Sequence, residues 1–184
     1  MTGVQTCALP ISGYDADTSI KLSRYVAPFK LQLYEQPVPF DDIAGMARVR
    51  REANAMGLPI MADESVLDHA SLINIIKANA ADLVKVKVMK QGGFINTRRM
   101  IATAEAAGVR CVVGHGFGLG INTMAEIMCA ATSKNVIEGL ECVGPLKTSD
   151  DIVTHKIDMS TGSMAVPGGP GLGGTLDEKI GRAH

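Results

Sequence analysis

Five residues capable of acid–base or metal chemistry recur along the chain, each at or beside the end of a short apolar run. They are Glu35, Asp63, Lys87, His115 and Glu141. The apolar runs are predicted to be β-strands over 31–35, 59–63, 83–88, 110–115 and 136–141. If these strands are parallel and close a barrel, their carboxyl ends meet on one face. The spacing therefore predicts a shared catalytic face.

Glu35 and Asp63 are the candidates for a metal site. Two carboxylates at the ends of neighbouring parallel strands repel each other unless a cation lies between them. Ligation by oxygen alone suits Mg²⁺ or Mn²⁺. For either acid taken by itself, a helix cap or a surface salt bridge remains an equal alternative.

Lys85 and Lys87 alternate with valines in the two-residue period of a strand. Val84, Val86 and Val88 lie on one face and the two lysines on the other. One interpretation is an edge strand whose lysines face water. The other is a barrel strand, which has no edge, with its lysines pointing inward, where a nearby cation and partial desolvation lower a lysine pKa towards that of a general base. We take Lys87 as the candidate acid/base.

Longer amphipathic segments separate the apolar runs and predict helices over 18–29, 41–56, 68–79, 97–107 and 123–132. This alternation is typical of βα units, which build either an open doubly wound sheet or a (β/α) barrel. An open sheet brings only its switch-point strands together, so polar residues at all five strand ends favour the barrel. The predicted fold class is α/β, a partial TIM-like barrel.

Both ends of the chain look foreign to this fold. Residues 1–12 resemble the translation of a sequencing adapter, and residues 180–184 resemble the same adapter read from the opposite strand. A signal peptide at 1–12 is disfavoured because the segment lacks a basic start. We expect a partial barrel over 13–145 and a Gly/Pro-rich tail over 146–179.

The net charge and the cysteine content limit the binding partners and the cellular compartment that we expect for this protein. The formal net charge is −1 with both signs interspersed, which gives no reason to expect nucleic acid or a membrane surface as partner. No apolar run is long enough to span a bilayer. Outside residues 1–12, Cys111, Cys129 and Cys142 lack metal-ligand spacing and fit a reducing cytoplasm.

Four motifs carry a resemblance to a known family. They are Tyr34-Glu35-Gln36-Pro37, Met61-Ala62-Asp63-Glu64-Ser65, Lys87-Val88-Met89-Lys90-Gln91-Gly92-Gly93 and the tail segment 166–173. Together they resemble the mandelate racemase/muconate-lactonizing branch of the enolase superfamily, and the lysine at 87 is closer to the muconate-lactonizing subgroup. The resemblance implies a (β/α)7β barrel that lacks its first strands and its N-terminal capping domain here. The tail over 146–179 would pack toward that domain.

The resemblance also implies roles for individual residues. Glu35 and Asp63 match the second and third ligands of Mg²⁺ or Mn²⁺, with Glu64 as their supporting neighbour. Lys87 matches the acid/base that removes the proton α to a carboxylate, giving an enediolate that the cation stabilises. The expected parent enzyme is a homo-oligomeric isomerase or lyase: a racemase or epimerase, a cycloisomerase or a dehydratase. Its small-molecule carboxylate substrate is expected to contact Lys85, Lys90, His115, Phe117 and Glu141.

Departures from the family pattern narrow these expectations. Leu9 stands where the first metal ligand is expected, so the chain as written is expected to be inactive. Lys87 replaces the aspartate that pairs with a histidine in the mandelate type, so His115 lacks that partner and the mandelate mechanism is disfavoured. Glu141 is the only acid kept from the Asp-x-Asp of dipeptide epimerases, which argues against a dipeptide substrate.

Two other functions fit the same residues. A Schiff-base aldolase would use Lys87 on a barrel strand and would need no metal. A catalytically dead scaffold would keep the fold without the missing ligand. Borohydride trapping of substrate on Lys87, with activity that survives EDTA, would favour the aldolase.

Overall fold

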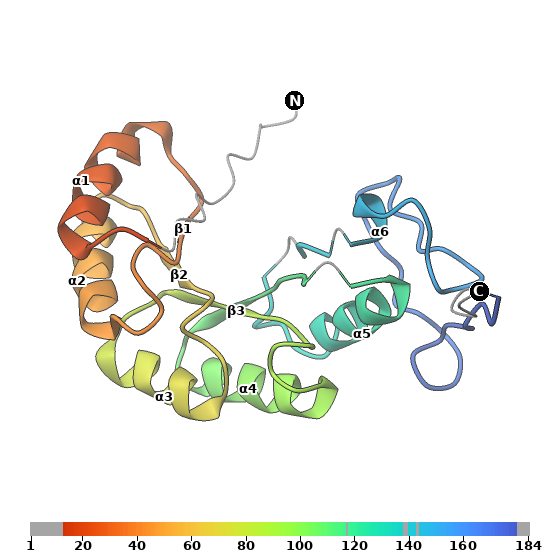
Figure 1. The fold of residues 1–184 in the computed structure, drawn as a ribbon. Helices are drawn as coiled ribbons and strands as arrows, with labels where there is room; N and C mark the ends of the chain where they lie inside the picture. The colour runs from red at the N-terminus through yellow and green to blue at the C-terminus, as the bar shows by residue number, and fades with distance from the viewer. Residues whose placement is uncertain (1–12, 117, 138–139, 143, 180–184) are drawn as a thin grey trace. The chain divides into compact units, whose positions relative to one another are not determined.

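The computed structural model describes residues 13–116, 118–137, 140–142 and 144–179. Helices alternate with short strands along these residues (Figure 1). The elements are α1 (Ala16–Val26), η1 (Ala27–Phe29), β1 (Tyr34–Glu35), α2 (Ile43–Asn54), β2 (Ile60–Ala62), α3 (His69–Ala78), β3 (Leu83–Val86), α4 (Phe94–Ala106), β4 (Arg110–Val113), α5 (Gly120–Ala130) and α6 (Gly144–Lys147).

The strands form one sheet in the order β1-β2-β3-β4, so neighbours in sequence are neighbours in the sheet. β2 pairs in parallel with β1 on one side and with β3 on the other. The register sets Glu35 opposite Met61 and Met61 opposite Leu83. The predicted α/β class with a parallel sheet is confirmed.

The strands are shorter than predicted because ladder pairing, and not apolar character, sets their bounds. Within the described residues β1 pairs only with β2: the Tyr34 N–H donates to the Pro59 carbonyl at 2.8 Å, and the Gln36 N–H donates to Met61 at 2.8 Å. β3 and β4 end before Lys87 and His115, which lie in the turns that follow.

The fifth predicted strand, over 136–141, falls partly on residues 138 and 139, which lie outside the described residues. None of the remaining residues of this stretch belongs to a named strand. The Glu141 N–H nevertheless donates to the Val113 carbonyl at 3.1 Å, which places residue 141 beside the end of β4.

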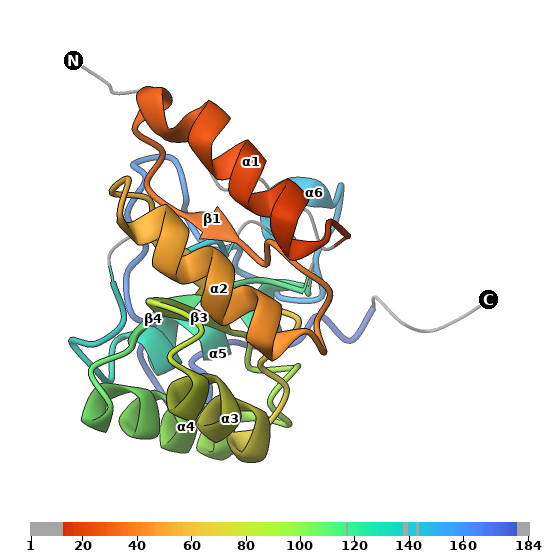
Figure 2. The same ribbon diagram turned by 90° about the vertical axis from the view of Figure 1, so that its left-hand side faces the viewer.

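The chain divides into two compact units. The first contains the residues up to Lys85 together with Thr103–Cys111, and the second contains Val86–Ala102 and the residues from Val112 onwards. In the first unit α1 packs against α2, and α2 packs against β2 (Figure 2). Among the largest fully buried side chains of this unit, those from its helices and strands are Tyr34, Met46, Val49, Ile60, Met61, Leu72 and Ile75. The expected domain division at residue 145 stays a prediction.

Aspartates begin the first three helices. The carboxylates of Asp15, Asp42 and Asp68 each accept a backbone N–H of the first helical turn at 2.8 Å. Asp68 and Ser71 form a reciprocal capping box at α3.

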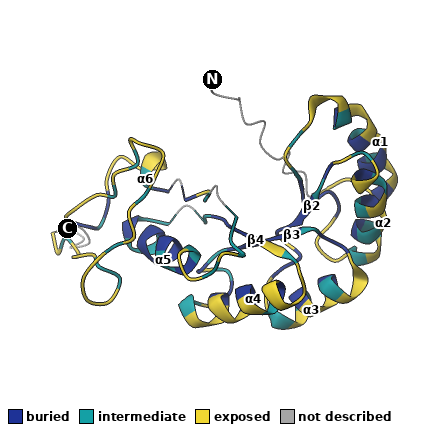
Figure 3. Cartoon of the chain, turned by 180° about the vertical axis from the view of Figure 1, so that it is seen from behind, coloured by how far each residue is buried: buried dark blue, intermediate teal, exposed yellow. Residues whose placement is uncertain are grey.

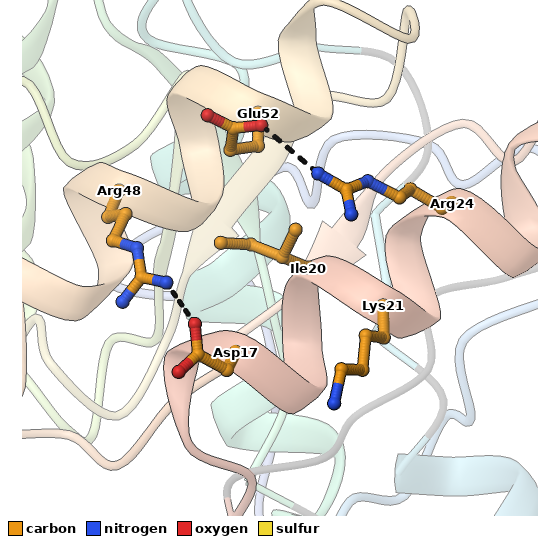
Figure 4. Close-up of a pocket in the computed structure, with 6 residues that line it drawn as sticks. All are labelled: Asp17, Ile20, Lys21, Arg24, Arg48 and Glu52. Carbon is orange, nitrogen blue, oxygen red and sulfur yellow. Dashed lines mark hydrogen bonds and ion pairs between the residues drawn. The ribbon is translucent and has the colours of Figure 1, made fainter.

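Ion pairs lie on the outer surface where α1 meets α2. Arg48 pairs with Asp17, and Arg24 pairs with Glu52 at 3.5 Å, on either side of the buried Ile20 (Figure 4). All four charged side chains are well exposed, so each pair contributes at most about 1 kcal/mol. The surface pocket that these residues line is therefore a solvated groove between two helices.

In the second unit α5 is largely buried (Figure 3) and is held at its start by the tail. The helix has no side-chain cap of its own at Leu119. Instead both oxygens of the buried Asp151 accept the Gly120 N–H, at 2.9 and 3.1 Å. Next to Asp151, Val153 forms an antiparallel bridge with Leu176. Tail packing toward a capping domain stays a prediction.

Within the described ranges, no helix combines the length and the apolar character needed to cross a membrane.

Candidate active site

The first cluster of functional side chains lies at the carboxyl ends of β1 and β2. Glu35 is the last residue of β1, and Asp63 directly follows β2. Because the two strands are paired in parallel, both acids leave the same edge of the sheet. Glu35 is 6 % exposed and Asp63 is 3 % exposed. The structure thus brings together the two predicted metal ligands as a buried carboxylate pair.

A buried lysine balances this pair. Lys85 Nζ lies 2.7 Å from Glu35 Oε1, and both side chains are almost completely buried. Burial raises the pKa of Glu35 to about 7; the Lys85 ammonium opposes this rise and the Asp63 carboxyl adds to it. Lys85 therefore acts as a counter-ion for Glu35, and its predicted contact with substrate stays a prediction.

Gln36 links the two strand ends through both ends of its amide. Its Oε1 accepts the backbone N–H of Asp63 at 3.0 Å and that of Ser65 at 3.2 Å. Its Nε2 donates to Ser65 Oγ at 2.9 Å and to the Val38 carbonyl at 3.0 Å. The backbone of Gln36 has φ 38°, a left-handed value that is uncommon outside glycine. Four hydrogen bonds of the Gln36 side chain offset the strain of this backbone conformation. They also fix the strand end that carries Glu35 relative to the one that carries Asp63.

The donor set suits a hard divalent cation. Two buried carboxylates offer oxygen ligands at neighbouring strand ends. The Lys85 ammonium beside Glu35 already supplies one positive charge to this pair. Among the described residues, no group of three or more His, Cys, Asp and Glu side chains is arranged to hold a metal.

A second cluster surrounds Lys87, in the turn between β3 and α4. The Lys87 N–H donates to the side-chain carbonyl of Gln91, and its own carbonyl accepts the N–H groups of Lys90 and Gln91 at 2.9 and 3.1 Å. Gly93, with φ 107°, closes the turn in a conformation that only glycine adopts readily. The backbone of Lys87 is therefore fixed directly after the strand. Lys87 is half-buried.

His115 belongs to the same unit as Lys87 and follows β4. Its side chain is only 3 % exposed and lies against α5, with Nε2 3.5 Å from Glu126 Oε2. Burial lowers the pKa of His115, and the positive charge of Lys87 lowers it further. The mandelate-type aspartate that would pair with His115 is replaced by Lys87, and the carboxylate beside His115 comes from α5 instead.

Glu126 is a fully buried acid and the only acid of α5. Its Oε1 accepts from Asn122 Nδ2 at 2.8 Å, whereas Oε2 has no hydrogen-bond partner among the described residues. Burial raises the pKa of Glu126 to about 7, against the opposing effects of Asn122, Cys142 and Lys87. A buried acid with this pKa beside a histidine is typical of functional sites.

The other predicted site residues that the structure describes are less buried. Glu64 and Glu141 are exposed, and Lys90 is half-buried. Phe117 lies outside the described residues. The structure places Lys90 in the Lys87 turn and Glu141 beside the end of β4. Their roles in binding substrate, and that of Glu64 in supporting the ligands, stay predictions.

Sequence reasoning missed two residues that organise the clusters. Gln36 was part of a quoted motif without a role, although a buried amide directly after a metal-ligand candidate is a signal in itself. Glu126 is the only acid of α5, which is made mostly of apolar residues, and a single acid in such a helix indicates a buried, partnered carboxylate. Their partners, however, are distant in sequence and could not be named.

Comparison with known proteins places this geometry in a family. The family model described as Enolase C-terminal domain-like matches residues 10–180. The chain is 36 % identical over 143 residues to the L-Ala-D/L-Glu epimerase of Bacillus subtilis, covering 78 % of this chain and 38 % of the relative. It is 31 % identical over 164 residues to muconate cycloisomerase 1 of Rhodococcus opacus, covering 89 % and 43 %.

A comparison with solved structures gives the same family. The crystal structure of the N-succinyl Arg/Lys racemase from Bacillus cereus superposes with a TM-score of 0.85 at 29 % identity, over 94 % of this chain and 46 % of that one. The chain thus spans less than half the length of these relatives, which are named as an epimerase, a cycloisomerase and a racemase. It belongs to the enolase C-terminal domain-like family, in the mandelate racemase/muconate-lactonizing branch of the enolase superfamily.

Proposed function

We propose that this chain supplies two metal ligands and one acid/base to a Mg²⁺-dependent isomerase or lyase that removes the proton α to a carboxylate. The observation that carries the proposal is the buried pair Glu35 and Asp63 at neighbouring strand ends, with a raised Glu35 pKa. The names of the relatives support an isomerase. Because the chain covers under half of each relative, the proposal concerns a complete enzyme that contains these residues.

Glu35 and Asp63 would hold Mg²⁺ through their carboxylate oxygens. The bound cation would neutralise the charge that develops on the carboxylate of a small-molecule substrate as its α-proton leaves. Lys87 would take that proton, and its fixed backbone in the turn after β3 limits the positions that its Nζ can reach. Lys85 would stay beside Glu35 and add positive charge to the region that receives the substrate anion.

Metal binding tests the first half of the proposal on a complete enzyme that contains this chain. Mn²⁺, which reports by electron paramagnetic resonance, is the probe for the Mg²⁺ site. Glu35→Gln and Asp63→Asn are each expected to weaken Mn²⁺ binding at least about tenfold. Asp41→Asn removes an exposed carboxylate near the same edge and is the matched control. Mn²⁺ binding that is unchanged by both ligand substitutions would overturn the assignment.

Proton exchange tests the second half on a complete enzyme containing this chain. In D2O, deuterium should enter the α-carbon of a carboxylate substrate, and Lys87→Ala should abolish this exchange without removing Mn²⁺ binding. Activity that survives EDTA, together with borohydride trapping of substrate on Lys87, would instead establish Schiff-base chemistry.

A further inference from the structure

Lys85 contacts Glu35 from a strand that is not its neighbour. The sheet order places β2 between β1, which ends in Glu35, and β3, which carries Lys85. The register pairs Ala62 with Val84. The residues that follow them, Asp63 and Lys85, therefore lie level with each other on neighbouring strands. The Lys85 side chain thus extends past the end of β2, and its ammonium lies at the edge of the sheet from which both acids leave.

The contact occupies one of the two carboxylate oxygens of Glu35. Lys85 Nζ lies 2.7 Å from Oε1, the length of a charge-assisted hydrogen bond, and the two side chains are 5 % and 8 % exposed. At this depth the attraction between the two charges is screened little by solvent, so the ion pair is held. Any further contact of the Lys85 ammonium leaves Oε1 occupied. A cation that binds here therefore meets a glutamate with one oxygen already in use.

The occupied oxygen limits how Glu35 can bind a metal. A carboxylate binds a cation either through one oxygen or, in the bidentate mode, through both. Bidentate binding by Glu35 would require Oε1 to leave the Lys85 ammonium and would break a buried ion pair. Binding through a single oxygen requires no such loss. The ion pair therefore favours the one-oxygen mode.

The ammonium also lowers the negative charge that a cation meets. Beside a cation Glu35 and Asp63 are both ionised, and the charge of Lys85 offsets one of the two carboxylates. Ca²⁺ prefers about six to eight oxygen ligands, commonly with a bidentate carboxylate, whereas the smaller Mg²⁺ binds through few carboxylates and keeps several waters. A site with a one-oxygen glutamate and reduced negative charge therefore suits Mg²⁺ better than Ca²⁺.

We propose that Lys85 sets the metal preference of this site: by holding Oε1 of Glu35 and offsetting one negative charge, it restricts Glu35 to a single oxygen ligand and favours Mg²⁺ over Ca²⁺. The inference rests on the proposed function, because it requires that Glu35 and Asp63 bind the cation. Lys85 is a positioning residue here, since it acts on the metal through Glu35.

Competition against Mn²⁺ in a complete enzyme that contains this chain measures the preference. Mg²⁺ and Ca²⁺ are each titrated against bound Mn²⁺, followed by electron paramagnetic resonance, and the readout is the ratio of their two dissociation constants. We expect the wild-type enzyme to bind Mg²⁺ more tightly than Ca²⁺. Lys85→Met keeps an unbranched side chain but removes the ammonium, and it should shift the ratio toward Ca²⁺ by at least about tenfold.

Lys77→Met is the matched control. Lys77 is an exposed lysine in the last turn of α3, so its replacement removes the same charge away from the two acids and should leave the ratio unchanged. A Lys85 that only stabilised the fold would change the free energy of unfolding when replaced, but not the ratio of the two dissociation constants. The ratio therefore separates a metal-selecting role from a structural one.

The failure of this inference is distinguishable from the failure of the metal site. If Mn²⁺ binding depends on Glu35 and Asp63 but Lys85→Met keeps the wild-type ratio, the inference alone is overturned. If Glu35→Gln and Asp63→Asn leave Mn²⁺ binding unchanged, both proposals are overturned.

A crystal structure of the wild-type enzyme with Mn²⁺ decides the question even if Lys85→Met does not fold. We expect Glu35 to place one oxygen on the metal and the other beside Lys85 Nζ. Both Glu35 oxygens on the metal, with the Lys85 ammonium displaced, would contradict the inference.

Discussion

The side-chain carbonyl of Gln36 accepts the backbone N–H of Asp63 at 3.0 Å, across the gap between two neighbouring strand ends. The contact ties the residue after Glu35 to the second acid of the pair. The position of each carboxylate therefore depends on an amide that is not itself a ligand. A fixed distance between two like charges is what a metal site requires, and four hydrogen bonds to Gln36 supply it.

Gln36→Ala is expected to lower the free energy of unfolding by about 2–4 kcal/mol, because it leaves the backbone N–H groups of Asp63 and Ser65 unpaired in a buried site. Mn²⁺ affinity should fall as well, since Asp63 is no longer held. Urea unfolding and Mn²⁺ titration measure the two effects. Gln32→Ala, at an exposed glutamine of the same segment, should change neither. Equal behaviour of the two variants would remove Gln36 from the site.

Lys85→Met should destabilise the chain more at pH 8 than at pH 5. Loss of one partner of a buried ion pair costs about 3–5 kcal/mol when the other stays charged. At pH 5 Glu35, with a pKa of about 7, accepts a proton and avoids most of that cost. Chemical denaturation at both pH values measures the difference. The exposed pair provides the comparison: Arg24→Met should cost under about 1 kcal/mol at either pH.

Glu126 should make the fold less stable as the pH rises. The carboxyl titrates at about 7 in the folded chain and near 4.5 when unfolded, so between these values the folded chain holds a proton that the unfolded chain has lost. The resulting stabilisation is complete below about pH 4.5 and disappears as the pH rises through about 7.

Glu126→Gln removes this linkage. The difference in unfolding free energy between wild type and variant should change by up to about 3 kcal/mol from pH 5 to pH 8, in the direction that favours the variant at high pH. Glu35 has the same sign of shift but is present in both proteins, so it cancels. A pH-independent difference would show that Glu126 has an ordinary pKa.

Asp151→Asn should loosen the tail from α5. The carboxylate accepts the Gly120 N–H at the start of a helix that has no other side-chain cap, so its neutralisation is expected to cost about 1–2 kcal/mol. Hydrogen exchange at Gly120 and at the Val153 bridge should accelerate together. Glu178→Gln is a charge-matched control in the same tail. Unchanged protection at both positions would show that Asp151 does not join them.

The sequence by itself determined the alternation of helices and strands and pointed to the residues of the proposed chemistry. Apolar runs and amphipathic segments alternate clearly enough to predict the parallel sheet, and Glu35 and Asp63 could be placed at the ends of neighbouring strands because the spacing of βα units is a local property. The sequence placed Lys87 inside a strand over 83–88, whereas β3 ends at Val86 and Lys87 begins the turn that Gly93 closes.

Tertiary structure alone decided which groups face one another. Strand lengths depended on ladder partners, so β1 begins three residues later than its apolar run. Lys85 pairs with Glu35, and His115 lies beside Glu126, in each case from a different segment of the chain. Burial raises the pKa values of Glu35 and Glu126, and no local sequence pattern shows this. Periodicity shows which face a residue lies on, but the identity of its partner depends on packing between segments far apart in the chain.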